Sequence, residues 1–277
     1  MKLNRKNISL FGFLAYAASS LGCASQNIKD KFEAKLGINN FRNCVTLLTP
    51  TYEDKRLEFI LNNINIPRSF LQEVNNINGK KLSLNDLSIL EVLYNDPAMY
   101  KQFKDRPYLE ARLSKIVDLT RKKWPKYYSV EYPLKDISNI NLLKAILLEE
   151  SIKKNKYYLI NIIQRDSEDK NTEYGGLFKY KNNKLTPVEY RPDTVIADYK
   201  YVAPFDQNFT GGIVPFHIHA NGSIGPSVGD LLHSLTYSVE SVVMGLEDEK
   251  LQAIFYSSLT SCGETKPEYF VLNIGSF

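Results

Sequence analysis

Apolar positions in the first half of the chain recur every three or four residues, which is the spacing of helices with one buried face. The clearest runs are Leu57, Ile60 and Leu61, and then Leu87, Leu90, Leu93 and Tyr94. Prolines interrupt the pattern where helices would be joined, at Pro50, Pro67, Pro97, Pro107, Pro125 and Pro133. We therefore predict a mostly α-helical accessory region over residues 24–135, without a catalytic constellation.

The second half changes to short segments rich in Tyr, Ile and Val, which favour strands. Strands are predicted at residues 157–164, 177–180, 213–219, 241–246, 251–256 and 269–274. Helices are predicted at residues 141–154 and 231–242, the second preceded by Ser227 and Asp230 in the form of a capping box. This order predicts an α/β (α+β) domain over residues 136–277, in which helices flank a mixed sheet.

The first 23 residues have the layout of a secretory signal. Basic residues precede an apolar run over residues 8–18, which leads through small residues to Cys23. The run is too short to cross a hydrocarbon layer of about 30 Å as a helix, so export is favoured over a permanent membrane span. We expect an exported protein of the cell envelope.

The segment Ser20-Leu21-Gly22-Cys23 resembles a bacterial lipoprotein signal, although such signals prefer leucine at the position of Ser20. The resemblance implies membrane attachment through a lipidated Cys23, with ordinary signal cleavage or a retained anchor as the alternatives. Cys44 and Cys262 would then remain, and whether they pair in an oxidising compartment is open.

Composition narrows the class of protein without naming a function. With 43% hydrophobic and 24% charged residues, the 277-residue chain is typical of a globular protein with one or two domains. Its 35 basic and 31 acidic residues leave a net charge of only +4. Because the basic residues are dispersed and no aromatic and basic platform accompanies them, we expect no nucleic-acid partner.

All three histidines of the chain, His217, His219 and His233, fall within one short stretch. Residues two apart on a strand face the same side, so His217 and His219 would project together, as a shared metal ion requires. The alternative is a polar strand face or a hydrogen-bonded pair. His233 is expected on a helix surface, near the site at most.

Two further polar residues follow the histidines at short spacing. Ser227 lies eight positions after His219, and Asp230 three positions after Ser227, across a glycine-bearing loop. Two imidazoles and one carboxylate make three protein ligands and leave a fourth position open, which is typical of catalytic zinc. Ser227 and Asp230 would look the same if they only capped a helix.

This spacing resembles the motif of the JAMM (JAB/MPN) metalloprotease family, in which His-x-His is followed after seven residues by Ser and after two more by Asp. That family also has a glutamate upstream, followed by Gly three positions later and by Leu four positions later. Glu173-Tyr174-Gly175-Gly176-Leu177 fits this pattern. Ala220 departs from the pattern, because proline usually follows the second histidine. The resemblance covers residues 136–277 and implies a JAMM/MPN-like fold, with Zn²⁺ held by His217, His219 and Asp230.

The resemblance also implies the roles of the remaining site residues. Glu173 would be the general base, and Ser227 would donate a hydrogen bond to the oxyanion. Glu149, Glu150 and Glu189 are competing glutamates, but their positions do not match the motif.

The expected function is therefore zinc-dependent hydrolysis of an amide bond, by a peptidase or isopeptidase acting on a peptide or protein of unknown identity. The alternative is a non-catalytic MPN-like binding or scaffold protein. Deaminase-like chemistry is disfavoured, because the His-x-Glu and Pro-Cys-x-x-Cys signature is missing from the sequence.

Overall fold

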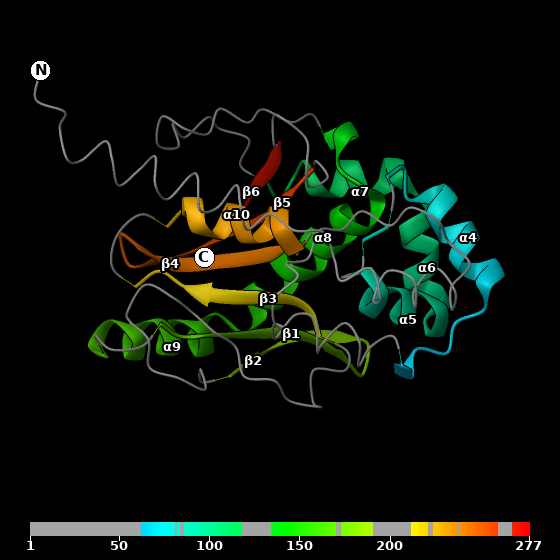
Figure 1. The fold of residues 1–277 in the computed structure, drawn as a ribbon. Helices are drawn as coiled ribbons and strands as arrows, with labels where there is room; N and C mark the ends of the chain where they lie inside the picture. The colour runs from blue at the N-terminus through cyan, green and yellow to red at the C-terminus, as the bar shows by residue number, and fades with distance from the viewer. Residues whose placement is uncertain are drawn as a thin grey trace, which may run out of the picture.

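The computed structural model describes residues 62–80, 82–83, 86–117, 134–169, 173–190, 212–220, 224–237, 239–259 and 268–277. The predicted signal and the cysteines Cys23, Cys44 and Cys262 lie outside these ranges. Seven labelled α-helices and six strands occupy the described part (Figure 1): α4 Arg68–Ile77, α5 Leu87–Asn95, α6 Pro97–Lys104, α7 Arg106–Leu113, α8 Asn139–Lys154, α9 Lys156–Glu168, β1 Gly175–Lys181, β2 Lys184–Glu189, β3 Gly212–Ile218, α10 Val228–Tyr237, β4 Ser241–Glu247, β5 Lys250–Ser258 and β6 Tyr269–Ser276.

The strands form one mixed sheet in the order β2-β1-β3-β4-β5-β6. β3 and β4 run parallel, and each other neighbouring pair is antiparallel. A parallel pair needs a crossover connection, which α10 supplies between β3 and β4. The predicted α+β class is thus confirmed at the level of a mixed sheet flanked by helices.

The two faces of the sheet pack against different helices. Val242 and Met244 of β4 belong to the large core that includes α8, whereas Val243 packs in a smaller cluster with Leu231 and Leu235 of α10. Alternation along the strand separates these side chains. The sheet is therefore a middle layer, with α10 over one face and α8 behind the other (Figure 1).

The large core is continuous between the helical region and the sheet. Leu90 of α5 and Phe103 of α6 are fully buried in the same cluster as Leu142 of α8 and Phe216 of β3. The predicted breaks between helices have local causes, since Asp96 precedes Pro97 and its carboxylate accepts hydrogen bonds from two backbone N–H groups of α6. The boundary predicted near residue 135 stays a prediction.

A buried ion cluster also joins the two regions. The ammonium of Lys144 on α8 is fully buried and donates to Asp86 at 3.0 Å and to Glu240 at 3.1 Å. Asp86 precedes α5, and Glu240 precedes β4. Burial alone lowers the pKa of Lys144, but the carboxylates of Glu240 and Asp86 outweigh it and raise that pKa above its usual value. The cation is thus charged in the folded protein.

Replacing Lys144 by methionine is expected to lower the free energy of unfolding by about 3 kcal/mol or more, because two carboxylates remain buried without their cation. Urea unfolding of the full chain measures the loss. Lys154→Met is the matched control, because Lys154 is exposed in the last turn of the same helix. Equal unfolding midpoints for the two variants would contradict this account.

Three elements differ from the sequence prediction. The helix predicted at residues 231–242 spans Val228–Tyr237. Residues 157–164, predicted as a strand, lie in helix α9, because Leu159, Ile162, Ile163 and Asp166 recur at helical spacing and form its buried face. Strand β2 was not predicted; it is a short edge strand that contains Pro187.

The other five predicted strands are confirmed within one or two residues at most ends. Among the described helices, none combines the length and the apolar character needed to cross a membrane.

Candidate metal centre

The two histidines of the motif lie at the end of β3 and directly after it, on the face covered by α10. Phe216 and Ile218 point into the large core behind the sheet, so the alternating residues His217 and His219 project from the opposite face. Their Nε2 atoms lie 3.2 Å apart. The local alternation predicted from the sequence therefore brings both imidazoles together.

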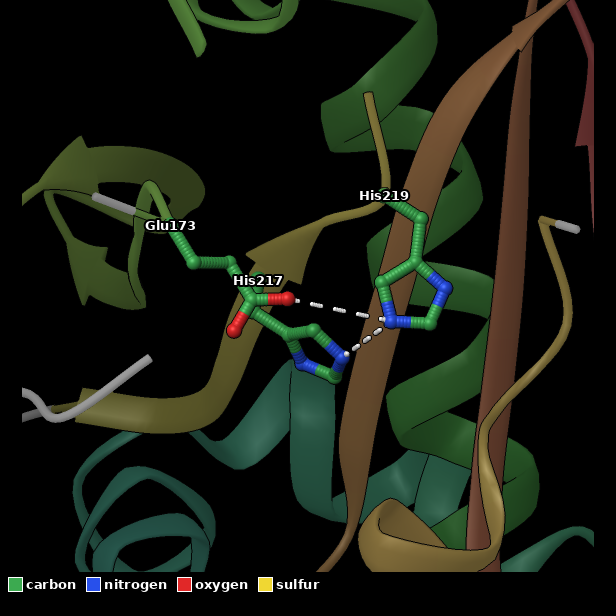
Figure 2. A group of neighbouring side chains, drawn as sticks. All are labelled: Glu173, His217 and His219. Atoms are coloured by element: carbon green, nitrogen blue, oxygen red, sulfur yellow. Dashed lines mark hydrogen bonds and ion pairs between the residues drawn. The ribbon is translucent and has the colours of Figure 1, made fainter. Parts of the chain in front are cut away.

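Glu173 reaches the histidines from the segment just before β1. Gly175 pairs with His217, and the Ile218 N–H donates to the Tyr174 carbonyl at 2.9 Å, so the ladder extends toward Glu173 and His219. Figure 2 shows the carboxylate of Glu173 pointing at the imidazole of His219, with Oε1 to Nε2 at 3.9 Å. Glu173 is only 7% exposed, whereas most glutamates in folded proteins are exposed to solvent.

Asp230 completes the group from the first turn of α10. One carboxylate oxygen lies 3.3 Å from Nε2 of His217, and the other lies 3.6 Å from Nε2 of His219. The Ser227 N–H donates to Asp230 at 2.6 Å, and the Asp230 N–H donates to the Ser227 hydroxyl at 3.2 Å. This is a reciprocal capping box, so capping α10 and facing the histidines are compatible roles for Asp230.

The buried group of Glu173, His217 and His219 can in principle hold a metal ion, because one ligand atom from each lies within 4.8 Å of the others. Ser227 is exposed at the rim of this group, next to Asp230. Its oxygen accepts from the Asp230 N–H, and its side chain also hydrogen-bonds the Asp230 carboxylate.

The charges of the group are strongly interdependent. Burial lowers the pKa of His217, but the carboxylate of Asp230, with a smaller effect of Glu173, raises that pKa above its usual value. Burial also works against ionisation of Asp230, yet His217 and hydrogen bonds from Ser227 hold the pKa of Asp230 well below its usual range. The carboxylates of Asp230 and Glu173 therefore stabilise a positive charge on His217.

Two neighbours of the site carry no signal in the sequence. Asp166 of α9 is buried and accepts from the Tyr174 N–H at 2.8 Å, which fixes the backbone directly after Glu173. Tyr256 of β5 is buried in the cluster under α10, and burial together with the charge of Asp230 raises its pKa well above the usual value. Their sequence separation from the motif hides both contacts.

The competing residues lie elsewhere. Glu189 forms an ion pair with Arg165 at 2.6 Å, and Glu150 forms one with Arg112 at 3.3 Å. Glu149 lines a separate pocket beside the end of β6. His233 is exposed on α10. Among the glutamates proposed from the sequence, Glu173 is the one that faces the histidines.

Gly245 of β4 lets His219 approach the sheet. A Cβ at this position would lie 2.7 Å from the His219 carbonyl oxygen and 3.2 Å from the Ile224 side chain. The His219 N–H also donates to the Met244 carbonyl at 2.8 Å. The backbone of the second histidine is thus held directly against β4, with no space for a side chain.

Gly245→Ala is expected to weaken metal binding by about tenfold or more, because it displaces a residue that orients a ligand. A chelator-competition titration measures the affinity. Gly229→Ala is the control, since its new Cβ would meet the Ser227 hydroxyl at an ordinary 3.5 Å. Unchanged affinity in Gly245→Ala would show that His219 is not held through this contact.

Comparisons of the chain with protein-family models, with curated proteins and with solved structures find no match.

Proposed function

We propose that this chain is an exported zinc-dependent amide-bond hydrolase of the JAMM type, in which His217, His219 and Asp230 hold Zn²⁺ and Glu173 acts as the general base. The observation that carries the proposal is that Glu173, His217 and His219 form one group and that Asp230 lies 3.3 Å from His217, although these residues come from the segment before β1, the end of β3 and the start of α10.

The spacing of the candidate ligand atoms supports zinc. Zinc bonds of about 2.0–2.1 Å in a tetrahedral arrangement put neighbouring ligand atoms roughly 3.3–3.4 Å apart. The two Nε2 atoms lie 3.2 Å apart, Oδ1 of Asp230 lies 3.3 Å from Nε2 of His217, and its other oxygen, Oδ2, lies 3.6 Å from Nε2 of His219. Two imidazoles and a carboxylate are also the donor set of known catalytic zinc sites. The residues present therefore fit this ion.

The longer separation between Glu173 and His219 fits a different role for Glu173. At 3.9 Å from Nε2 of His219, its carboxylate is close enough to hydrogen-bond a water molecule shared with the ligands. Zinc would supply Lewis acidity and lower the pKa of that water to about 7. Glu173 would take the proton from the water and pass it to the leaving amine.

The location of Ser227 supports its role as an oxyanion donor. Its hydroxyl is exposed beside Asp230, at the rim of the group that would hold the metal ion. When a carbonyl carbon becomes tetrahedral, the negative oxygen needs donors that are already in place. Ser227 would supply one such donor, while the capping box fixes its position.

A peptide library tests the reaction class while the substrate is still unidentified. We expect the zinc-loaded chain to hydrolyse a subset of α-peptide or lysine isopeptide bonds, with new termini identified by mass spectrometry. A chelator should stop the reaction, and added zinc should restore it. If the zinc-loaded wild type forms no cleavage products beyond those seen with Glu173→Gln, the hydrolase proposal fails. The scaffold function would then be favoured.

A further inference from the structure

A pocket lies on the face of the sheet opposite the candidate metal centre. It has a volume of about 700 Å³ and lies between the ends of α7 and α8, the start of α9 and the end of β6. Its position behind the sheet follows from Ile274, which lines the pocket and belongs to the core shared with α8. Small-molecule pockets typically measure roughly 300–1,000 Å³, so this one is large enough for a ligand.

The charge of the lining is strongly positive. Four basic side chains line the pocket, and Glu149 is its one acidic side chain; the basic residues are Arg112, Lys115, Lys153 and Lys156. Arg112 also contacts Glu150 at 3.3 Å, but both side chains are more than a third exposed, so this ion pair is weak and open to exchange. The net charge of the whole chain is only +4, whereas four basic side chains line this one pocket.

Helix stability explains only part of this arrangement. Lys153 lies in the last turn of α8, where the helix dipole favours a cation. Lys156 is the first residue of α9, where the same dipole disfavours one. Lys153 and Lys156 thus place two cations at the junction of α8 and α9.

The apolar part of the lining lies on the β6 side of the pocket. Gly275 has φ +149°, and a Cβ there would collide with the ring of Phe277. Glycine therefore allows the Phe277 ring to lie close to the backbone of residue 275; Phe277, Ile274 and Ile116 all line the pocket.

We propose that this pocket binds a phosphate-bearing ligand, with Lys153 and Lys156 among the groups that contact the phosphate. Lysine and arginine bind phosphate through charge-assisted hydrogen bonds, and the pocket offers both types of side chain. The phosphate group belongs either to a small soluble molecule or to a lipid headgroup. This site is independent of the hydrolase proposal, because it uses none of the same residues.

Calorimetric titration of the full-length chain with inorganic pyrophosphate tests the soluble source. We expect binding that weakens by at least about tenfold in Lys153→Gln/Lys156→Gln, because hydrogen bonds to charged groups are lost. The matched control is Lys181→Gln/Lys184→Gln, which removes two exposed charges from the β1–β2 hairpin and should bind as the wild type does. Thermal melting checks that both variants are folded.

Vesicle co-sedimentation tests the lipid source, by comparing phosphatidylglycerol vesicles with phosphatidylcholine vesicles. A preference for phosphatidylglycerol that is lost only in Lys153→Gln/Lys156→Gln would assign the phosphate to a lipid and support the site. Pyrophosphate binding that survives in this variant, for instance through zinc at the other site, would overturn the proposal. So would equal losses in both double variants, or no binding to either probe.

Discussion

His217→Ala and Asp230→Asn are each expected to remove the zinc ion that we expect wild type to bind at about one per chain, because three protein ligands are the usual minimum for a catalytic zinc site. Metal content by mass spectrometry of the purified full chain measures this. Asparagine is preferred to alanine at residue 230, because its side-chain oxygen can still accept from the Ser227 N–H that now bonds Asp230 at 2.6 Å. Loss of zinc then reflects the ligand rather than an uncapped α10.

His233→Ala is the matched control for this experiment. His233 is exposed on the same helix, three residues after Asp230, and should retain the ion when replaced. Zinc should also raise the melting temperature of wild type and His233→Ala but not of the two site variants, since an ion that binds only the folded state stabilises it. If the wild-type protein holds no zinc even after reconstitution, Asp230 only caps α10 beside two histidines that bind no metal. A scaffold function would then be favoured.

Glu173→Gln is expected to lower the hydrolytic rate by about 10²–10⁴-fold, the usual contribution of a general base, while zinc content stays at the wild-type value. The substitution keeps the size and a hydrogen-bonding oxygen but removes the ability to accept a proton. The rate is measured on whichever peptide the library identifies, at saturating and limiting concentrations, so that kcat and kcat/KM are separated.

Glu149→Gln serves as the control, because Glu149 lines the distant pocket and is not near the histidines. We expect it to cleave at the wild-type rate. If Glu173→Gln lost zinc together with activity, Glu173 would be a ligand rather than a base. If its rate equalled that of wild type, proton transfer would have to be assigned to another group.

Much of the sheet could be predicted because its strands carry strong local patterns. β4 and β5 are nearly continuous apolar runs, typical of strands covered on both faces. The prediction failed where two signals conflicted. Residues 157–164 are rich in aromatic and β-branched side chains, yet their helical period decided the outcome. The predicted helix at 231–242 ends at Tyr237, because Val242 is needed in the sheet beside Phe216.

The candidate site was predictable to the extent that its residues are close in sequence. His217 and His219 share a face through strand alternation, and Ser227 and Asp230 share a helix turn. Asp166 and Tyr256 could not be found in this way, because α9 and β5 are far from the motif in sequence and lie near the site only in the folded protein. Their contacts depend on tertiary packing, for which a single sequence gives no spacing rule.

The continuous core shared by the helical region and the sheet has a consequence for genetics. Leu90 and Phe103 contact neither the histidines nor Glu173 in any described interaction, yet they are buried in the same core as Phe216, which precedes His217. A screen for loss of function would therefore recover two classes of mutant. Substitutions at the site would inactivate at every temperature, whereas substitutions in α5 and α6 would act by depleting folded protein and be temperature-sensitive. Hits in the helical half would thus report shared stability rather than a second active centre.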